Sequence, residues 1–307
     1  SQQENLRDVE ENHLVQEEQY SRLLGLDGRQ ELWHNTSLPA LVTYARNDAH
    51  AQAVSFIRAA AKPNDELTDI STTLEYLYLK LLQIPVAYLY CVKGRHRSLV
   101  TLSQVSNYCN SSKCAIIDLD LDVFPSHVSD ESIHHALSRV GGVVFCEASQ
   151  RWSGTAAELA ALWARAAAGA GVLAWPRRAA VTSLTHPRMF HYFHASTDDF
   201  LFVQMMDVTR LIVVNKPTVA EIMRPWIQCA LTLDCIMPIG AQSVGCRFDK
   251  KPQYRYSGCH GQDASALSIV LGLRSGFEDA AYVVSCIGYL RKSQDDRTRF
   301  ISSCRQL

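Results

Sequence analysis

The sequence predicts an α/β fold in three layers, with a mainly parallel sheet between helices. Continuous apolar runs, typical of strands buried on both faces, stand at residues 41–47, 114–121 and 141–148, and we expect these three to be the central strands of the sheet. Stretches with apolar residues at helical spacing separate these runs, and strands that alternate with helices form parallel sheets. A content of 47% hydrophobic and 20% charged residues is that of an ordinary globular chain.

The first half of the chain is expected to alternate regularly. We expect strand 41–47, helices 49–61 and 72–82, strand 86–92, strand 114–121, helix 131–140 and strand 141–148. Pro63 and the polar residues after it end the first helix. Thr155 and Glu158 have the spacing of a capping box, which predicts an Ala-rich helix directly after the last of these strands.

The second half is less regular. Its expected elements are strands at 172–175, 200–207 and 211–215, a helix that a second capping box (Thr218 and Glu221) begins and that runs to residue 231, and an apolar helix at 264–273. No repeat or low-complexity linker divides the chain, so we expect one domain over residues 38–307. Residues 1–37 are expected to form an acidic stem or N-terminal helix, because residues 1–31 hold eight acids and three arginines, a net charge of −5.

Charge and hydropathy exclude some partners. The whole chain has a net charge of −1, which gives no general attraction to nucleic acid or to an anionic membrane. No run approaches 18 uncharged apolar residues, so no membrane span is expected. The chain begins at Ser1 rather than Met, from which we expect that an N-terminal piece has been removed.

The cysteines indicate an oxidising compartment. The chain has ten cysteines without the paired CxxC spacing of a zinc site, and N-x-S sequons stand at Asn35 and Asn110. We expect most cysteines to be disulfide-bonded, although buried free thiols in a cytosolic protein are the alternative. The expected bonds are Cys109 with Cys114, and pairs drawn from Cys229, Cys235, Cys246 and Cys259.

Polar residues follow three of the expected strands. In an open parallel sheet the ligand lies beyond the carboxyl ends of the strands, which makes Asn47, the run Asp118–Asp122 and Glu147 the first candidates. For the aspartates, exposed alternate positions of a strand are the simpler interpretation. Glu147 at the tip of strand 141–148 would be costly to bury without a cation or a donor beside it.

Several segments together resemble a poorly characterised animal family of GT-A-like glycosyltransferases. The segments are LVTYARNDAHAQAVSFIRAA, DLDVFPSHV, VVFCEASQRW, THPRMFHYF, PWIQCAL and GCRFDKKPQYRYSGCHGQDASALSIVL, in an order that covers most of residues 38–273. The resemblance implies a GT-A-like three-layer sandwich with a Rossmann-like central sheet. It also implies a Golgi-luminal or secreted type II glycoprotein, which moves a sugar from a nucleotide-sugar donor to a glycan or glycoprotein acceptor.

The resemblance also implies a donor site. The Asp-x-Asp step that holds a divalent cation and the diphosphate in such enzymes reads Glu147-Ala148-Ser149 here. Replacement of the second acid by Ser149 predicts weak or absent binding of Mn²⁺ or Mg²⁺, because hard cations prefer carboxylate oxygens. Arg151 or the lysines at 250 and 251 would then carry the phosphate charge. We expect Glu147, Ser149, Arg151 and Asn47 to bind the donor.

A second step, Cys259-His260-Gly261-Gln262-Asp263, resembles the family's Cys-His-x-x-Asp-Gln step. His260 would be a metal ligand, together with Glu147, or a phosphate donor, and Asp263 would act on the acceptor as the catalytic base. A loop histidine beside a disulfide and a helix N-cap are the structural alternatives for these two residues. The family's Gln is Ala264 here. We expect Glu147, Ser149 and His260 to converge in one cleft, with Asp263 at its rim.

Two other functions stay open. The departures at Ser149 and Ala264 favour a catalytically inactive GT-A-like binding or scaffold protein. A cytosolic Rossmann-type methyltransferase would use Glu147 as an acidic strand-end residue, but the chain lacks a glycine-rich loop after strand 41–47. The methyltransferase alternative also predicts free thiols.

Overall fold

The computed structural model describes residues 40–45, 87–93, 114–120, 141–146, 150–152, 156–249, 254–284 and 290–292. It is a mixed α/β structure that divides into two compact units. Unit 1 holds residues 169–208 and 216–285, and unit 2 holds residues 31–168, 209–215 and 286–307, with residues 1–30 assigned to unit 1. The expected stem and the helices expected at 49–61, 72–82 and 131–140 lie outside the described residues.

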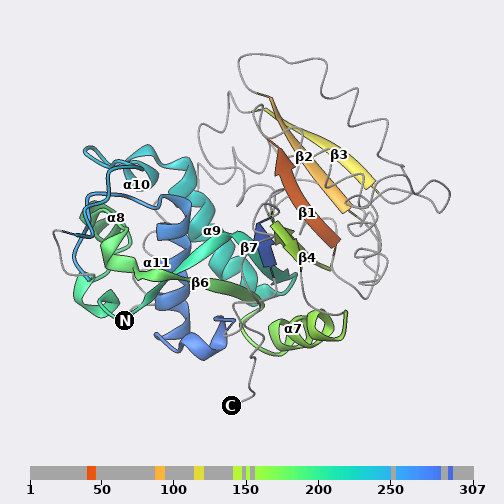
Figure 1. Cartoon of the computed structure of the whole chain (residues 1–307). Coiled ribbons are helices and arrows are strands. Elements are labelled where there is room, and N and C mark those ends of the chain that lie inside the picture. The colour runs from red at the N-terminus through yellow and green to blue at the C-terminus, as the bar shows by residue number, and fades with distance from the viewer. Residues whose placement is uncertain are drawn as a thin grey trace. The chain divides into compact units, whose positions relative to one another are not determined.

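Unit 2 contains the parallel strands (Figure 1). Its strands are β1 (Ala40–Ala45), β2 (Ala87–Lys93), β3 (Cys114–Asp120) and β4 (Gly142–Cys146). They run in the order β3-β2-β1-β4, and all three pairings are parallel. The last residues of β7 (Gln204–Val214) pair with β4 in antiparallel register, with Val213 opposite Val143, so the sheet is mixed.

Three smaller elements complete the described part of unit 2. β5 (Gln150–Trp152) and β8 (Leu290–Lys292) form a separate antiparallel pair. Helix α7 (Ala156–Ala168) follows β5, as the Ala-rich stretch predicts. A Cβ atom at Gly142 would lie 2.1 Å from Cη2 of Trp163, so only glycine lets β4 pass this close to α7.

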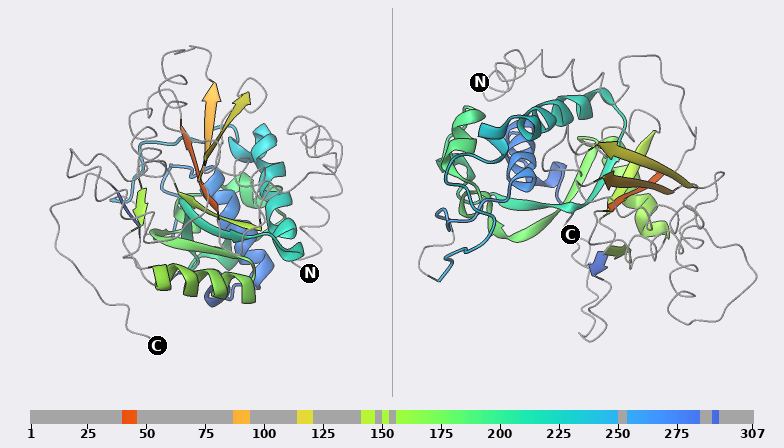
Figure 2. Two further views of the ribbon diagram at one scale, coloured as in Figure 1. Left: turned by 90° about the vertical axis from the view of Figure 1, so that its right-hand side faces the viewer. Right: turned by 90° about the horizontal axis from the view of Figure 1, so that it is seen from above.

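Unit 1 is built around one buried helix. It contains β6 (Val172–Ala180) beside the first part of β7, and helices α8 (Pro187–Tyr192), α9 (Pro217–Leu231), α10 (Leu233–Ile236) and α11 (Asp263–Ser275). Every residue of α11 from Ala264 to Leu273 is buried, as expected for a helix that is apolar on most sides. α11 packs against α9, and the two lie side by side in both views of Figure 2.

Three expectations about the elements were wrong. The strands expected at 200–207 and 211–215 are one strand, β7, because Thr209 and Arg210 continue the extended chain. Strand β3 ends the order of the described strands of unit 2 and is not central. Helix α9 starts at Pro217 with Lys216 as its N-cap, and the hydroxyl of Thr218 donates to the carbonyl of Ala170 instead of capping the helix.

No helix in the described part of the chain is both long and apolar enough to cross a bilayer.

Candidate functional site around His260

The candidate site lies in unit 1, in the segment between α10 and α11, of which the structure describes residues 237–249 and 254–260. We call these described residues the stapled loop, because the disulfide Cys246–Cys259 joins its two limbs. A second disulfide, Cys229–Cys235, joins the end of α9 to α10. Both bonds confirm the pairing expected within this group of four cysteines. Of the other expected pair, Cys109 lies outside the described residues.

The segment that precedes α8 binds the C-terminal end of the stapled loop through its backbone carbonyls. The carbonyl of Ser183 accepts hydrogen bonds from the backbone and the hydroxyl of Ser257, at 2.9 and 2.7 Å. The carbonyl of Leu184 accepts from the backbone of Gly261 and the hydroxyl of Ser265, at 2.7 and 2.9 Å. Two consecutive backbone carbonyls therefore fix the end of the loop and the start of α11.

His260 is buried at the centre of this arrangement, with 3% of its surface exposed. Its Nδ1 accepts a hydrogen bond from the backbone N–H of His186 at 3.2 Å. Its Nε2 lies 3.1 Å from the carbonyl oxygen of Ile236, to which it donates when Nδ1 is the acceptor. The backbone N–H of His260 also donates to the carbonyl of Gln242, at 2.6 Å. The ring thus connects the start of α8 to the end of α10.

His186 stands beside His260 and contributes to the electrostatics of the site. Its ring packs edge-on against Tyr256, with centroids 5.4 Å apart, and its Nδ1 accepts from the backbone N–H of Arg188. Partial burial, and to a lesser extent the charge of Arg188, lowers the pKa of His186. Burial raises the pKa of Tyr256. Both side chains therefore favour their neutral forms.

Asp263 is the first residue of α11, one position inside the N-cap. The N-cap is Gln262, with φ 50° and ψ −114°, a strained conformation for a residue other than glycine. Oδ1 of Asp263 accepts from the N–H of Ala264 at 2.8 Å, and the backbone carbonyl of Asp263 accepts from the indole N–H of Trp226 at 3.1 Å. The carboxylate therefore lies at the positive end of the helix dipole, where negative charge is stabilised.

The structure places two of the expected site residues together and leaves the others undescribed. His260 and Asp263 belong to one turn that leads into α11. Asn47, Glu147 and Ser149 lie outside the described residues, and Arg151 is described only as a backbone position in β5. The expected convergence of Glu147, Ser149 and His260 stays a prediction.

His260 does not fit the metal-ligand role that was expected of it. Both ring nitrogens already have backbone partners, so binding a cation would break one of two buried hydrogen bonds. Within the described residues, no group of three or more His, Cys, Asp or Glu side chains is arranged to hold a metal ion.

Sequence reasoning missed the hydroxyl-rich segment before α8. Thr182, Ser183 and Thr185 are buried, and the hydroxyl of Thr182 donates to the carbonyl of Tyr254 at 2.7 Å. The available signal was the group of hydroxyl-bearing residues in VTSLTH, directly after the strand expected to begin at residue 172, since buried hydroxyl groups such as that of Thr182 usually find partners elsewhere in the chain.

No protein-family model and no curated protein matches this chain significantly. Among solved structures, the chain is similar to mouse xyloside xylosyltransferase 1 in its apo form, with a TM-score of 0.39 and 11% sequence identity. The match covers 81% of this chain and 85% of that chain. A likeness this distant assigns neither a family nor an activity, so the function rests on the residues themselves.

Proposed function

We propose that this chain is a luminal or secreted glycosyltransferase that moves a sugar from a nucleotide-sugar donor to a glycan or glycoprotein acceptor. The observation that carries the proposal is the strained turn at Gln262, which holds the Asp263 carboxylate at the N-terminus of a helix that is buried from Ala264 to Leu273. Strain of this kind persists where the surrounding structure over-determines it, and it is concentrated at functional sites. The sequence resemblance gives this same position to the acceptor-side carboxylate.

The proposed fold is a GT-A-like three-layer sandwich whose parallel strands β1, β2 and β4 support the donor side. One domain over residues 38–307, preceded by the stem at 1–37, belongs to this proposal. The two disulfides support an oxidising compartment, such as the Golgi lumen or the cell exterior, and count against the cytosolic methyltransferase alternative.

The proposed chemistry uses Asp263 as the base. A hydroxyl oxygen of the acceptor attacks the anomeric carbon of the donor sugar, and the bond from that carbon to the diphosphate oxygen breaks. The nucleoside diphosphate leaves with the bonding electron pair, and the hydroxyl proton passes to the Asp263 carboxylate. Glu147, Ser149 and Asn47 bind the donor in this scheme. Arg151 and the lysines at 250 and 251 stabilise the leaving diphosphate, which leaves Mn²⁺ or Mg²⁺ with a weak role or none.

A catalytically inactive binding or scaffold protein is the second candidate. The observation that favours it is the backbone pairing of both ring nitrogens of His260, which gives this residue a structural role. In that case the segment Cys259-His260-Gly261-Gln262-Asp263, which resembles the family's Cys-His-x-x-Asp-Gln step, would serve only to hold the stapled loop in place.

The deciding experiment measures donor binding and transfer separately. Glu147→Ala should abolish binding of nucleoside diphosphates in calorimetry while the melting temperature stays within a few degrees of that of the parent protein. Asp263→Asn should keep donor binding and lower transfer roughly 10²- to 10⁴-fold, the usual contribution of a general base. Asp199→Asn, at an exposed acid of the same unit, is the matched control and should change neither.

One result would reject the enzyme, namely that the parent chain binds no nucleoside diphosphate or sugar nucleotide, with or without manganese, which favours the scaffold. Normal donor binding by Glu147→Ala would remove Glu147 from the donor site, and unfolding of this variant would make Glu147 structural; either result moves the scaffold ahead.

A further inference from the structure

His186 carries a hydrogen-bond donor that the described part of the chain leaves unused. Nδ1 of its ring accepts from the backbone N–H of Arg188, so the proton of the neutral ring is on Nε2. Partial burial, followed by the charge of Arg188, lowers the pKa of His186 and so favours this neutral ring. No described residue accepts a hydrogen bond from Nε2. The half-buried ring therefore offers one N–H, in a fixed tautomer, to a molecule from outside.

Gly240 keeps the space in front of this N–H open. A Cβ atom at position 240 would lie 3.9 Å from Nε2 of His186, and no other described atom beyond the adjoining residues would come within 4 Å of it. Gly240 is exposed and has a φ of 89°, which residues with a side chain rarely adopt. The backbone of the stapled loop thus favours the one residue type that does not cover Nε2.

Two tyrosines border the same place. The ring of Tyr256 packs edge-on against that of His186, with centroids 5.4 Å apart. Tyr254 stands two residues earlier and is 46% exposed, and its backbone carbonyl accepts from the hydroxyl of Thr182 at 2.7 Å. The C–H faces of sugar rings pack on aromatic side chains, while a few placed polar groups fix the orientation of a ligand. An N–H donor beside an exposed tyrosine is therefore a combination suited to a saccharide.

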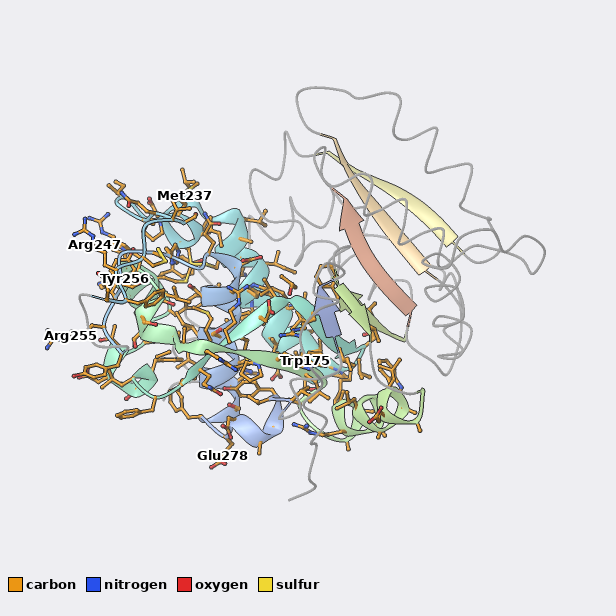
Figure 3. The ribbon with its side chains drawn as sticks, viewed as in Figure 1. Trp175, Met237, Arg247, Arg255, Tyr256 and Glu278 are labelled. Atoms are coloured by element: carbon orange, nitrogen blue, oxygen red, sulfur yellow. A yellow bond between two sulfur atoms is a disulfide. The ribbon has the colours of Figure 1, made fainter. Side chains whose placement is uncertain are left out.

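Positive charge accompanies these groups. The charge of Arg188 contributes to the lowered pKa of the imidazole, so its guanidinium lies within electrostatic reach of that ring. Arg247 and Arg255 are exposed, and in Figure 3 their side chains point outward at the same end of unit 1 as Tyr256. Among the described residues of the stapled loop, Asp249 is the one acid. An anionic ligand is therefore favoured over a neutral one.

We propose that this surface binds an acidic saccharide. A carboxylate or sulfate oxygen of the ligand accepts the hydrogen bond from Nε2 of His186, and a sugar ring packs against Tyr254. The guanidinium groups of Arg188 and Arg255 pair with the negative charges of the ligand. We call this the His186 surface, and its residues are His186, Arg188, Gly240, Tyr254, Arg255 and Tyr256.

The His186 surface adjoins the turn that holds the proposed base. The backbone N–H of His186 donates to Nδ1 of His260 at 3.2 Å, and His260 stands three residues before Asp263. We therefore assign the acidic saccharide to the acceptor, and this assignment rests on the proposed function. The binding itself uses neither Asp263 nor Glu147. Acidic glycans are polyanions of the secretory lumen and the cell exterior, the compartments that the two disulfides support.

The test is calorimetry of the full 307-residue chain with short oligosaccharides of equal length at neutral pH. Hyaluronan fragments carry carboxylates, heparin fragments also carry sulfates, and chitin fragments are neutral. We expect binding to an acidic oligosaccharide and none to the neutral one; hyaluronan binding would show that a carboxylate suffices, and binding to heparin alone would identify a sulfate. His186→Asn keeps an acceptor for the N–H of Arg188 but loses the Nε2–H donor, so it should bind roughly tenfold more weakly.

Two glycines of the stapled loop give a matched pair of variants. Gly240 and Gly245 have φ angles of 89° and 84°, so replacement by alanine strains the backbone similarly at both positions. A Cβ atom at Gly245 would meet no described atom within 4 Å, whereas one at Gly240 would lie against Nε2 of His186. Gly240→Ala should therefore bind roughly tenfold more weakly, while Gly245→Ala binds like the parent chain.

A second pair of variants tests the charge. Arg188→Gln/Arg255→Gln should bind roughly tenfold more weakly, because hydrogen bonds to charged groups contribute most to such pairing. Arg178→Gln, at an exposed position of β6, is the control and should bind like the parent chain. Circular dichroism should show all variants folded.

Several outcomes would overturn the proposal. They are no binding of either acidic oligosaccharide by the parent chain, equal binding of the neutral one, unchanged affinity in His186→Asn, and equal losses in Gly240→Ala and Gly245→Ala. Displacement of the oligosaccharide by uridine diphosphate would assign the surface to the donor instead. Each of the first four results leaves the proposed function intact, because donor binding and its loss in Glu147→Ala are measured with nucleoside diphosphates alone.

Discussion

The two disulfides of unit 1 close loops of very different character. Cys229–Cys235 spans six residues at the corner between α9 and α10, and both cysteines are fully buried. Cys246–Cys259 spans 13 residues of the stapled loop, with Cys246 exposed and Cys259 buried. One disulfide therefore lies in the core of unit 1, and the other reaches its surface.

Backbone hydrogen bonds explain the difference between the two. At the buried corner the N–H of Thr232 donates to the carbonyl of Cys229, and the N–H of Cys235 donates to that of Thr232. Helical bonding thus fixes this corner with or without the disulfide. Across the stapled loop two described backbone bonds join the limbs, from the N–H of Arg247 to the carbonyl of Ser257 and from the N–H of His260 to the carbonyl of Gln242. The comparison teaches that the surface disulfide reinforces bonds between segments distant in the chain, whereas the buried one reinforces local helical bonding.

The largest expected effect comes from removing the surface disulfide. Cys246→Ala/Cys259→Ala should lower the free energy of unfolding by about 3 kcal/mol, because a loop of this length restrains the unfolded chain strongly. Limited proteolysis should then cut within the stapled loop before the rest of unit 1. Urea denaturation and mass spectrometry of the first fragments measure the two effects.

Cys229→Ala/Cys235→Ala is the matched comparison. Its shorter loop predicts a loss of about 2 kcal/mol, and helical bonding at the corner predicts no new early cleavage site. A larger loss here than in the surface variant would show that packing of the buried sulfur atoms outweighs loop entropy, and would reverse the comparison.

The sequence predicted the group of bonded cysteines and several elements because their signals are local. Short separations predicted that Cys229, Cys235, Cys246 and Cys259 pair among themselves, without saying which pairs form, and the apolar stretch 264–273 predicted most of α11. The apolar runs predicted β1, β3 and β4. The place of β3 in the strand order was not predicted, because a continuous apolar run does not distinguish an edge strand from a central one.

The surroundings of His260 could not be predicted from the sequence. The partners of its ring, Ile236 and His186, stand 24 and 74 residues away in the chain, and both bonds use backbone groups that carry no residue-specific signal. The resemblance suggests a metal ligand or phosphate donor at this position, whereas the structure gives both ring nitrogens backbone partners. Asp263 was expected just before the helix at 264–273, with an N-cap as its structural alternative, whereas it is the first residue of α11 and Gln262 is the N-cap. An acid before an apolar stretch is a local signal that marks the start of a helix only to within about a residue.

The next largest effect concerns His260, which connects the two disulfide loops. It follows Cys259 directly, and its ring bonds to Ile236, the neighbour of Cys235. His260→Ala would leave the carbonyl of buried Ile236 and the N–H of half-buried His186 without this partner, so we expect a loss of about 2 kcal/mol in the free energy of unfolding. His191→Ala, at an exposed position of α8, should lose less than about 0.5 kcal/mol. Equal losses of unfolding free energy in the two variants would show that the His260 ring does not stabilise the connection between the two disulfide loops.

The smallest expected effect is a pH dependence that originates at His186. Because partial burial and Arg188 lower its pKa in the folded chain, the unfolded chain binds a proton at higher pH than the folded chain does. The stability contributed by neutral His186 is therefore complete above the ordinary pKa of about 6.5 and is lost as the pH falls toward the folded value.

His186→Asn should flatten the slope of unfolding free energy against pH below about 6.5, measured by urea denaturation at a series of pH values. Asparagine can still accept the hydrogen bond from Arg188 that begins α8, so a general loss of stability would be kept apart from the loss of slope. An unchanged slope in His186→Asn would assign the titration to another group and leave the stapled loop without a pH response from this residue.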